Sequence, residues 1–213
     1  MKRWRCLFLG LGAGLLLGYQ VALAEAPRTV VIGSDVAEIL AMLDALEGVV
    51  GRDDTSQYPE RVAALPSVGY LRQLAAEGIL SLAPERLIVG AAAGPREVLA
   101  QLEAVGVEVV RIEQGANLAA LPAKIRAVAS AIGRDDAGDA LVSEIEAKFA
   151  TLEAQRQTTQ GPGPSAMFLL SHSGMTPMAA GRDTAGQAVI EAAGARKTWT
   201  WPVHPQSDGV HLL

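Results

Sequence analysis

The sequence predicts an α/β protein with two lobes joined by a long α-helix. In the first half of the chain, short β-branched runs alternate with amphipathic helical segments, which is typical of a parallel sheet covered by helices on both faces. From Leu118 to Gln157 there is no strand candidate, and an apolar strand-like run follows at 166–170. The chain therefore divides into a first lobe, a helical connection and a second lobe.

Residues 25–117 contain the elements expected of the first lobe. RTVVI at 28–32 is a strand, and Gly33-Ser34-Asp35 supplies a turn and a capping residue for the helix that follows. The other strand candidates are GVVG at 48–51, RLIVG at 86–90 and VEVVRI at 107–112, and a glycine ends the helix predicted at 95–106.

Residues 118–160 are expected to form a helical segment that includes the linker between the lobes. Two helical stretches meet near Gly133, and the second, of about 20 residues, would be roughly 30 Å long. In the partial second lobe, 161–213, AMFLL at 166–170 predicts a buried strand and Thr184–Ala193 predicts a helix ended at Gly194.

The first 24 residues are typical of a cleaved secretory signal. Three basic residues precede an apolar run from Cys6 to Leu17, and Ala22-Leu23-Ala24 matches the pattern of a cleavage site. The alternative, an uncleaved membrane anchor, would need about 20 apolar residues. Cys6 is the only cysteine, so we expect a soluble periplasmic product without disulfides.

The charge of the chain argues against a nucleic-acid partner. The sequence has 18 basic and 23 acidic residues, a net charge of −5. Three of the basic residues and none of the acidic ones precede Glu25, so the remainder carries 15 minus 23, or −8. Nucleic-acid binding depends on a basic surface, which this composition does not supply.

Tyr70 is the first candidate for chemistry. Pro66 and Gly69 place it in a loop just before a helix. If the backbone is extended there, Tyr70 and Arg72 project to the same side, and the guanidinium favours the phenolate. A phenolate suits ferric iron, and tyrosine is a known axial ligand of haem. The alternative is a half-buried tyrosine beside a solvated arginine.

His172 is the second candidate. It directly follows the apolar run at 166–170, and strand ends in open α/β sheets face ligand crevices. Methionines and glycines on either side of it would form an apolar, polarizable wall against which a flat macrocycle could lie. The alternative is a structural histidine held by hydrogen bonds.

Four runs carry a resemblance to a known family: VIGSDVAEIL (31–40), GRDDTSQYPE (51–60), LPSVGYLRQLAAEGILSL (65–82) and LLSHSGMTPMAAG (169–181). Together they resemble the periplasmic haemin-binding proteins of bacterial ABC haem importers, which are helix-linked, class III solute-binding proteins. The resemblance runs from about Arg28 to Arg196. It implies two Rossmann-like lobes joined by a long helix, with haem b held in the cleft between them.

The resemblance also implies roles for individual residues. Tyr70 matches the axial ligand of the haem iron, and Arg72 matches a neighbour that hydrogen-bonds it or pairs with a propionate. His172 matches a position that faces the cleft from the second lobe and can ligate a second or stacked haem. Glu77 and Glu191, each in a helix of its own lobe, match acids that pair with arginines of the permease dimer and so orient the encounter.

The polar residues after the GVVG strand allow two interpretations, a ligand contact or a turn. Arg52, Asp53 and Asp54 lie near the mouth of the implied cleft, where they could meet haem propionates. Asp-Asp-Thr-Ser is also an ordinary turn composition, and we favour the turn. Arg52 and Arg72 are the first cations to test, because a planar guanidinium clamps a carboxylate well.

The sequence departs from the family after Arg196, where KTWTWPVHPQSDGVHLL lacks a helical period. We expect a second lobe left incomplete by truncation or frameshift. The resulting hypothesis is a monomeric periplasmic receptor, not an enzyme, that captures haem and delivers it to an ABC permease with its ATPase.

Three alternatives stand beside this hypothesis. A receptor for a corrinoid or a ferric siderophore would share the fold, and a truncated product could be a nonfunctional remnant. An exported hydrolase would use Ser171 or Ser173 with His172. Neighbouring residues of a strand point to opposite faces, and the sequence has no G-x-S-x-G elbow, so the hydrolase is disfavoured.

Overall fold

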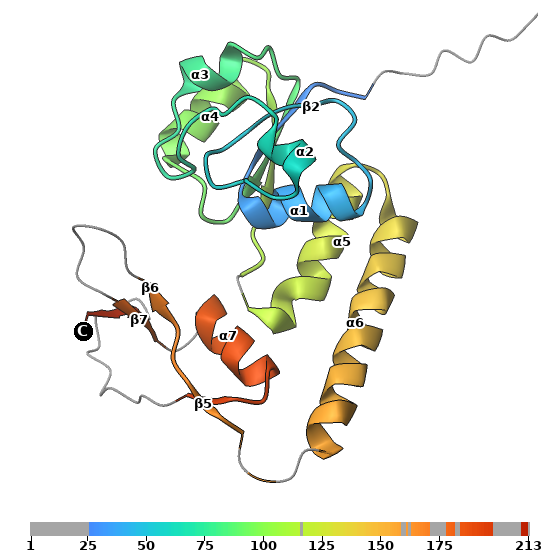
Figure 1. The fold of residues 1–213 in the computed structure, drawn as a ribbon. Coiled ribbons are helices and arrows are strands. Elements are labelled where there is room, and N and C mark those ends of the chain that lie inside the picture. Colours follow the sequence, from blue (N-terminus) through green and yellow to red (C-terminus); the bar gives the residue numbers. More distant parts are fainter. Residues whose placement is uncertain are drawn as a thin grey trace, which may run out of the picture.

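A computed structural model describes residues 26–115, 117–158, 161, 163–170, 178–181, 184–197 and 210–212. Its first part is a four-stranded parallel sheet in the order β2-β1-β3-β4 (Figure 1). The strands are β1 (Thr29–Ile32), β2 (Val49–Arg52), β3 (Arg86–Gly90) and β4 (Glu108–Ile112). Each of the four strands expected from the sequence is confirmed, and so is the parallel sheet.

Four helices lie between these strands: α1 (Ser34–Met42), α2 (Glu60–Ala63), α3 (Ala76–Leu80) and α4 (Arg96–Ala104). The capping residue expected for α1 is absent, because the N-cap is Gly33, which has a φ of 113° and no side chain to accept a hydrogen bond. A positive φ at that position favours glycine. Gly106, with a φ of 94°, follows α4 as predicted.

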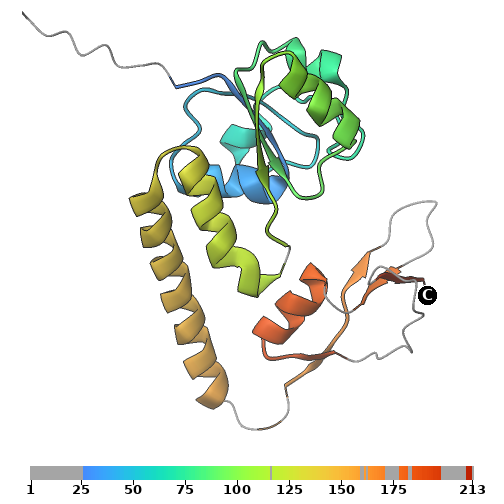
Figure 2. The same ribbon diagram turned by 180° about the vertical axis from the view of Figure 1, so that it is seen from behind.

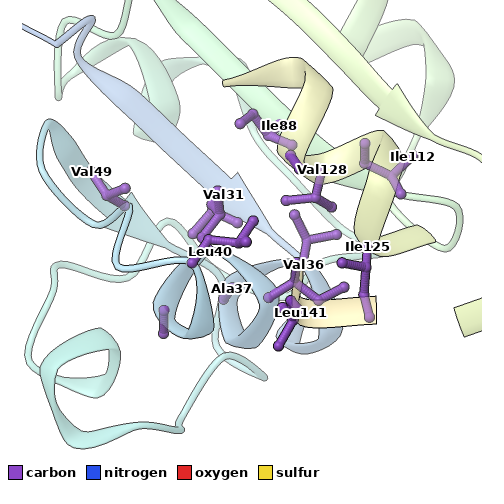
Figure 3. Packing of buried hydrophobic residues seen from close by; sticks show 14 of the residues in the cluster. Val31, Val36, Ala37, Leu40, Val49, Ile88, Ile112, Ile125, Val128 and Leu141 are labelled. Atoms are coloured by element: carbon purple, nitrogen blue, oxygen red, sulfur yellow. The ribbon is translucent and has the colours of Figure 1, made fainter. Parts of the chain in front are cut away.

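The sheet is covered on both faces, because its strand residues alternate between two apolar clusters. Val31 and Ile88 pack with residues of α1 and of two later helices (Figure 3). Val30, Ile32 and Leu87 point to the opposite face and pack with α3 and α4. Each fully buried side chain of this kind contributes about 1.5–3 kcal/mol to the free energy of unfolding. The two clusters together therefore stabilise the register of the strands.

A helical hairpin follows β4. It consists of the 3₁₀ turn η1 (Leu118–Ala120), α5 (Leu121–Ala131) and α6 (Asp135–Thr158), and Gly133, at a φ of 68°, lies between the two helices. The 24 residues of α6 correspond to about 36 Å, which confirms the expected long helix. Leu141 and Val142 anchor its first half in the core, while its second half runs on beyond the sheet (Figure 2).

The remaining described elements form a second group. They are β5 (Ser165–Ala166), β6 (Leu169–Leu170), β7 (Met178–Ala180), α7 (Ala185–Ala192), β8 (Arg196–Lys197) and β9 (Val210–Leu212). Strands β5 and β8 pair in parallel, and β6, β7 and β9 form an antiparallel sheet. The helix predicted at 184–193 is confirmed: the Thr184 hydroxyl accepts from the Gln187 amide, and Gly194 ends the helix at a φ of 72°.

The single buried strand expected at 166–170 is wrong. The run is split between β5 and β6, which belong to different sheets. Its side chains from Met167 to Leu170 are 46–53% exposed. A buried strand needs elements on both faces, whereas here Phe168 packs against Gly186 of α7 and all four side chains keep about half of their surface exposed. Among the described residues, no helix is long and apolar enough to cross a membrane.

Candidate functional site

The loops that follow the four parallel strands meet at one edge of the sheet, where open α/β sheets bind ligands. A cavity of about 320 Å³ lies at this edge. It is lined by residues that follow each of the four strands, and by Leu71 and Lys124. The carboxyl edge of the sheet is therefore the candidate site.

The loop that carries Tyr70 is fixed to this edge on two sides. On the side of β2, the Arg52 carbonyl accepts from the Val68 amide and the Asp54 amide donates to the Gly69 carbonyl, both at 2.9 Å. On the side of β3, the Gly94 amide donates to the Leu71 carbonyl at 2.8 Å. Between these anchors Tyr70 is 44% exposed, so the residue is open to solvent at this edge of the sheet.

The backbone from Tyr70 to Gln73 is a turn. The Gln73 amide donates to the Tyr70 carbonyl at 2.8 Å, so the extended conformation that would send Tyr70 and Arg72 to the same side is not present. Arg72 is exposed, and in the described part of the chain no hydrogen bond joins the two side chains. The turn keeps both residues at the edge without pairing them.

The Asp53 side chain holds the turn after β2 together, as expected from the turn composition of this segment. Its carboxylate is 0% exposed and accepts from the Gly33 amide at 2.8 Å, the Ser56 hydroxyl at 2.6 Å and the Thr55 amide at 2.8 Å. Burial alone would raise the pKa of Asp53, but the hydrogen bonds from Ser56, Thr55 and Gly33 lower it below its usual value. The residue thus joins the start of α1 to the loop after β2.

Arg52 is also structural. Its guanidinium donates to the carbonyl of Asp53 and to that of Ala63, both at 3.0 Å. The side chain is partly buried and ties β2 to the end of α2. Asp54 is exposed and accepts from the Ser67 hydroxyl. Of the two cations singled out in the sequence, only Arg72 remains exposed for a ligand.

The structure adds three residues to the candidate site: Lys124, Asp35 and Gln114. Lys124 is 6% exposed, and its ammonium donates to Asp35 Oδ2 at 2.5 Å. Gln114 Oε1 is buried, and it has no hydrogen-bond partner among the described residues. The sequence does contain a signal for Lys124, because it precedes Val128 by four residues and so lies on the apolar face of α5.

The other predicted site residues lie elsewhere or outside the description. Glu77 is exposed on α3, and Glu191 is exposed on α7, where it accepts from Gln187 Nε2 at 2.6 Å. His172, Ser171 and Ser173 lie outside the described residues, as do residues 1–24. In the part of the chain that the structure covers, no group of three or more His, Cys, Asp or Glu residues could hold a metal ion.

Comparisons with known proteins place these observations in context. The family model described as periplasmic binding protein matches residues 30–201. The periplasmic heme-binding protein BhuT, in complex with two hemes, is similar at 33% identity and a TM-score of 0.78, over 88% of this chain and 70% of its own. A search of the curated proteins gives no match.

Two further solved structures are similar. The periplasmic heme-binding protein RhuT from Roseiflexus sp. RS-1, in apo form, shares 40% identity at a TM-score of 0.75, over 80% of this chain and 65% of its own. The periplasmic heme binding protein HutB of Vibrio cholerae shares 30% identity at a TM-score of 0.73, over 87% of this chain and 70% of its own. The chain spans about two thirds of the length of these structures.

Proposed function

The chain belongs to the periplasmic binding protein family, and from this membership we propose that it captures haem in the periplasm and delivers it to an ABC permease. The ligand is inferred from similar structures, which are heme-binding proteins at 30–40% identity. One observation on this chain carries the proposal. Tyr70, a residue type that can ligate haem iron, stands exposed on an anchored loop at the carboxyl edge of the sheet.

In the proposed complex, the Tyr70 phenolate is the axial ligand of ferric haem. The ferric iron itself would displace the phenol proton on binding. Arg72, exposed two residues away on the same turn, pairs with a propionate or with the phenolate once haem is bound. His172 faces the same haem, or a second one, from the other lobe. The chain binds its ligand and does not transform it.

The proposed cleft lies between two lobes, 25–117 and 161–213, with residues 118–160 as the helical segment between them. The leader, 1–24, would be removed on export. Apolar porphyrin faces are buried when the lobes close, and this burial adds to the single iron–oxygen bond. Release then requires the lobes to separate.

Separation is proposed to begin at the permease. Glu77 on α3 and Glu191 on α7 are exposed on helices of different lobes. Paired with arginines of a permease dimer, the two carboxylates would hold one lobe each. Such pairs supply orientation and encounter rate more than affinity, which suits a carrier that must dock and leave.

The test is a titration of the purified mature chain with hemin and, separately, with cobalamin. We expect a saturable Soret change with hemin and none with cobalamin. Tyr70→Phe should raise the hemin dissociation constant at least about tenfold. Tyr58→Phe is the matched control, because Tyr58 is exposed and is the only other tyrosine after the leader. Binding of cobalamin in place of hemin would favour the corrinoid alternative.

A further inference from the structure

The segment that precedes Tyr70 is attached to the free edge of β2. The Arg52 amide donates to the Pro66 carbonyl, and the Arg52 carbonyl accepts from the Val68 amide, both at 2.9 Å. Ser67 pairs with Arg52 in parallel as an isolated bridge. Because β2 is an outer strand of the four-stranded sheet, this pairing extends the sheet toward Tyr70. The segment therefore approaches Tyr70 from a fixed position.

Gly69, the residue immediately before Tyr70, has both of its backbone polar groups linked to Asp54. Its carbonyl accepts from the Asp54 amide at 2.9 Å. Its amide donates to Ser67 Oγ at 3.2 Å, and the Ser67 hydroxyl donates in turn to the Asp54 carboxylate. A hydroxyl can donate and accept at the same time, so Ser67 joins the loop after β2 to the backbone before Tyr70. Gly69 has a φ of 99°, which glycine adopts without strain.

The peptide planes on both sides of Tyr70 are held in this way. The Gly69 carbonyl belongs to the plane before Tyr70, and the Tyr70 carbonyl, which accepts from the Gln73 amide at 2.8 Å, belongs to the plane after it. The backbone sets the direction of the Cα–Cβ bond, while Tyr70 itself stays 44% exposed. A ligating side chain whose backbone is fixed beforehand loses less conformational freedom when it binds.

We propose that Ser67 and Asp54 are positioning residues for Tyr70: their linked hydrogen bonds set the direction in which the phenol leaves the loop. The inference rests on the proposed function and deepens it, because it assigns part of the hemin affinity to two residues that do not touch the haem. Hydrogen bonds that orient a metal ligand strengthen metal binding without contact to the metal. Asp54 acts here as a hydrogen-bond acceptor for Ser67, and its charge makes no contribution.

The experiment is a set of hemin titrations on variants that remove or keep these hydrogen bonds. Ser67→Ala and Asp54→Ala should each raise the hemin dissociation constant about twofold to tenfold, the range of one neutral hydrogen bond. Ser67→Thr keeps the hydroxyl and Asp54→Asn keeps an acceptor oxygen, so both should bind hemin like the wild type. Because the two side chains act through one link, the double alanine variant should bind no more weakly than Ser67→Ala.

A spectroscopic readout separates positioning from a general loss of stability. In the hemin-loaded protein, the phenolate-to-iron charge-transfer band should shift in Ser67→Ala and return to the wild-type position in Ser67→Thr. Both side chains are exposed, so the urea midpoint of each ligand-free variant should stay close to that of the wild type. Ser143→Ala is the matched control, because it removes an exposed hydroxyl that donates to the Asp139 carbonyl on α6.

The possible failures are distinguishable. If both alanine variants keep the wild-type affinity and charge-transfer band, the positioning role is wrong and the haem receptor stands. Equal weakening by Asp54→Ala and Asp54→Asn would also overturn it, since the charge of Asp54 would then be the cause. If wild-type protein does not bind hemin, or Tyr70→Phe binds hemin as tightly as the wild type, the proposed function fails and this inference fails with it.

Discussion

Lys124 on α5 and Asp35 on α1 form an ion pair at 2.5 Å between residues 89 positions apart in the chain. Lys124 lies on the face of α5 that packs against the core, where Ile125 and Val128 are fully buried. A buried ammonium is tolerated only when it is paired. The pair therefore fixes the helical hairpin to the first lobe beside the candidate site.

Removing the carboxylate of Asp35 should lower the free energy of unfolding more than removing the ammonium of Lys124. Asp35→Asn leaves a buried ammonium unpaired, and we expect a loss of about 1–2 kcal/mol in the free energy of unfolding, moderated by the exposure of Asp35. Lys124→Met keeps an apolar stem and leaves a carboxylate that water can reach, so its loss should be smaller. Urea unfolding of both variants checks the order, and equal losses would contradict it.

Asp53 predicts how stability depends on pH. Because its pKa is lowered in the folded protein, its contribution is fully present above the unfolded-state value of about 3.9 and is lost as the pH falls through the folded pKa. Wild-type protein should therefore lose stability below about pH 4. Asp53→Asn should be less stable at pH 7 and lose less between pH 5 and acid. Urea unfolding at a series of pH values measures both curves; parallel curves would refute the assignment.

Substitutions of Arg52 and of Arg72 should separate an effect on stability from an effect on hemin binding. Arg52→Ala removes two hydrogen bonds to backbone carbonyls, and we expect a loss of about 1–3 kcal/mol in stability with little change in hemin affinity. Arg72→Ala alters an exposed side chain, so stability should change by less than about 0.5 kcal/mol while hemin binding weakens. Thermal melts and hemin titrations on the two variants give the comparison. The reverse pattern would reassign the propionate contact to Arg52.

Substitutions of Glu77 and Glu191 should affect the delivery of haem to the permease and not the capture of haem. Glu77→Lys and Glu191→Lys place a cation where an arginine of the permease is expected, so haem transfer to the permease in proteoliposomes should fall in each variant and further in the double variant. Hemin affinity should not change. Glu146→Lys, an exposed position on α6, is the matched control. Unchanged transfer by the double variant would remove these residues from the docking surface.

Local patterns predicted most of the first lobe. Strands β1 to β4 are short β-branched or apolar runs, and glycines with positive φ follow α4, α5 and α7 at Gly106, Gly133 and Gly194. Such signals act within a few residues, so the sequence alone displays them. The same locality explains why Tyr70 was found on its loop, between Gly69 and the helix that begins at Ala76.

The predictions from the sequence failed where contacts between distant segments determine the structure. The backbone after Tyr70 closes a turn, and hydrogen bonds to Arg52, Asp54 and Gly94 hold the loop on both sides. No alternation of side chains reveals these contacts. The apolar run at 166–170 looks like a buried strand, but its exposure depends on which elements cover it. The pairing of Lys124 with Asp35 joins segments 89 residues apart, and periodicity shows only that Lys124 lies on an apolar face.

The central claim is that the phenolate of Tyr70 binds ferric haem iron, and resonance Raman spectroscopy of the hemin-loaded protein tests it most directly. With excitation into the phenolate-to-iron charge-transfer band, wild-type protein labelled with ring-deuterated tyrosine should show phenolate modes shifted from those of unlabelled protein. The modes should persist in Tyr58→Phe and vanish in Tyr70→Phe. Absence of phenolate modes from the wild type, or their survival in Tyr70→Phe, would contradict the account.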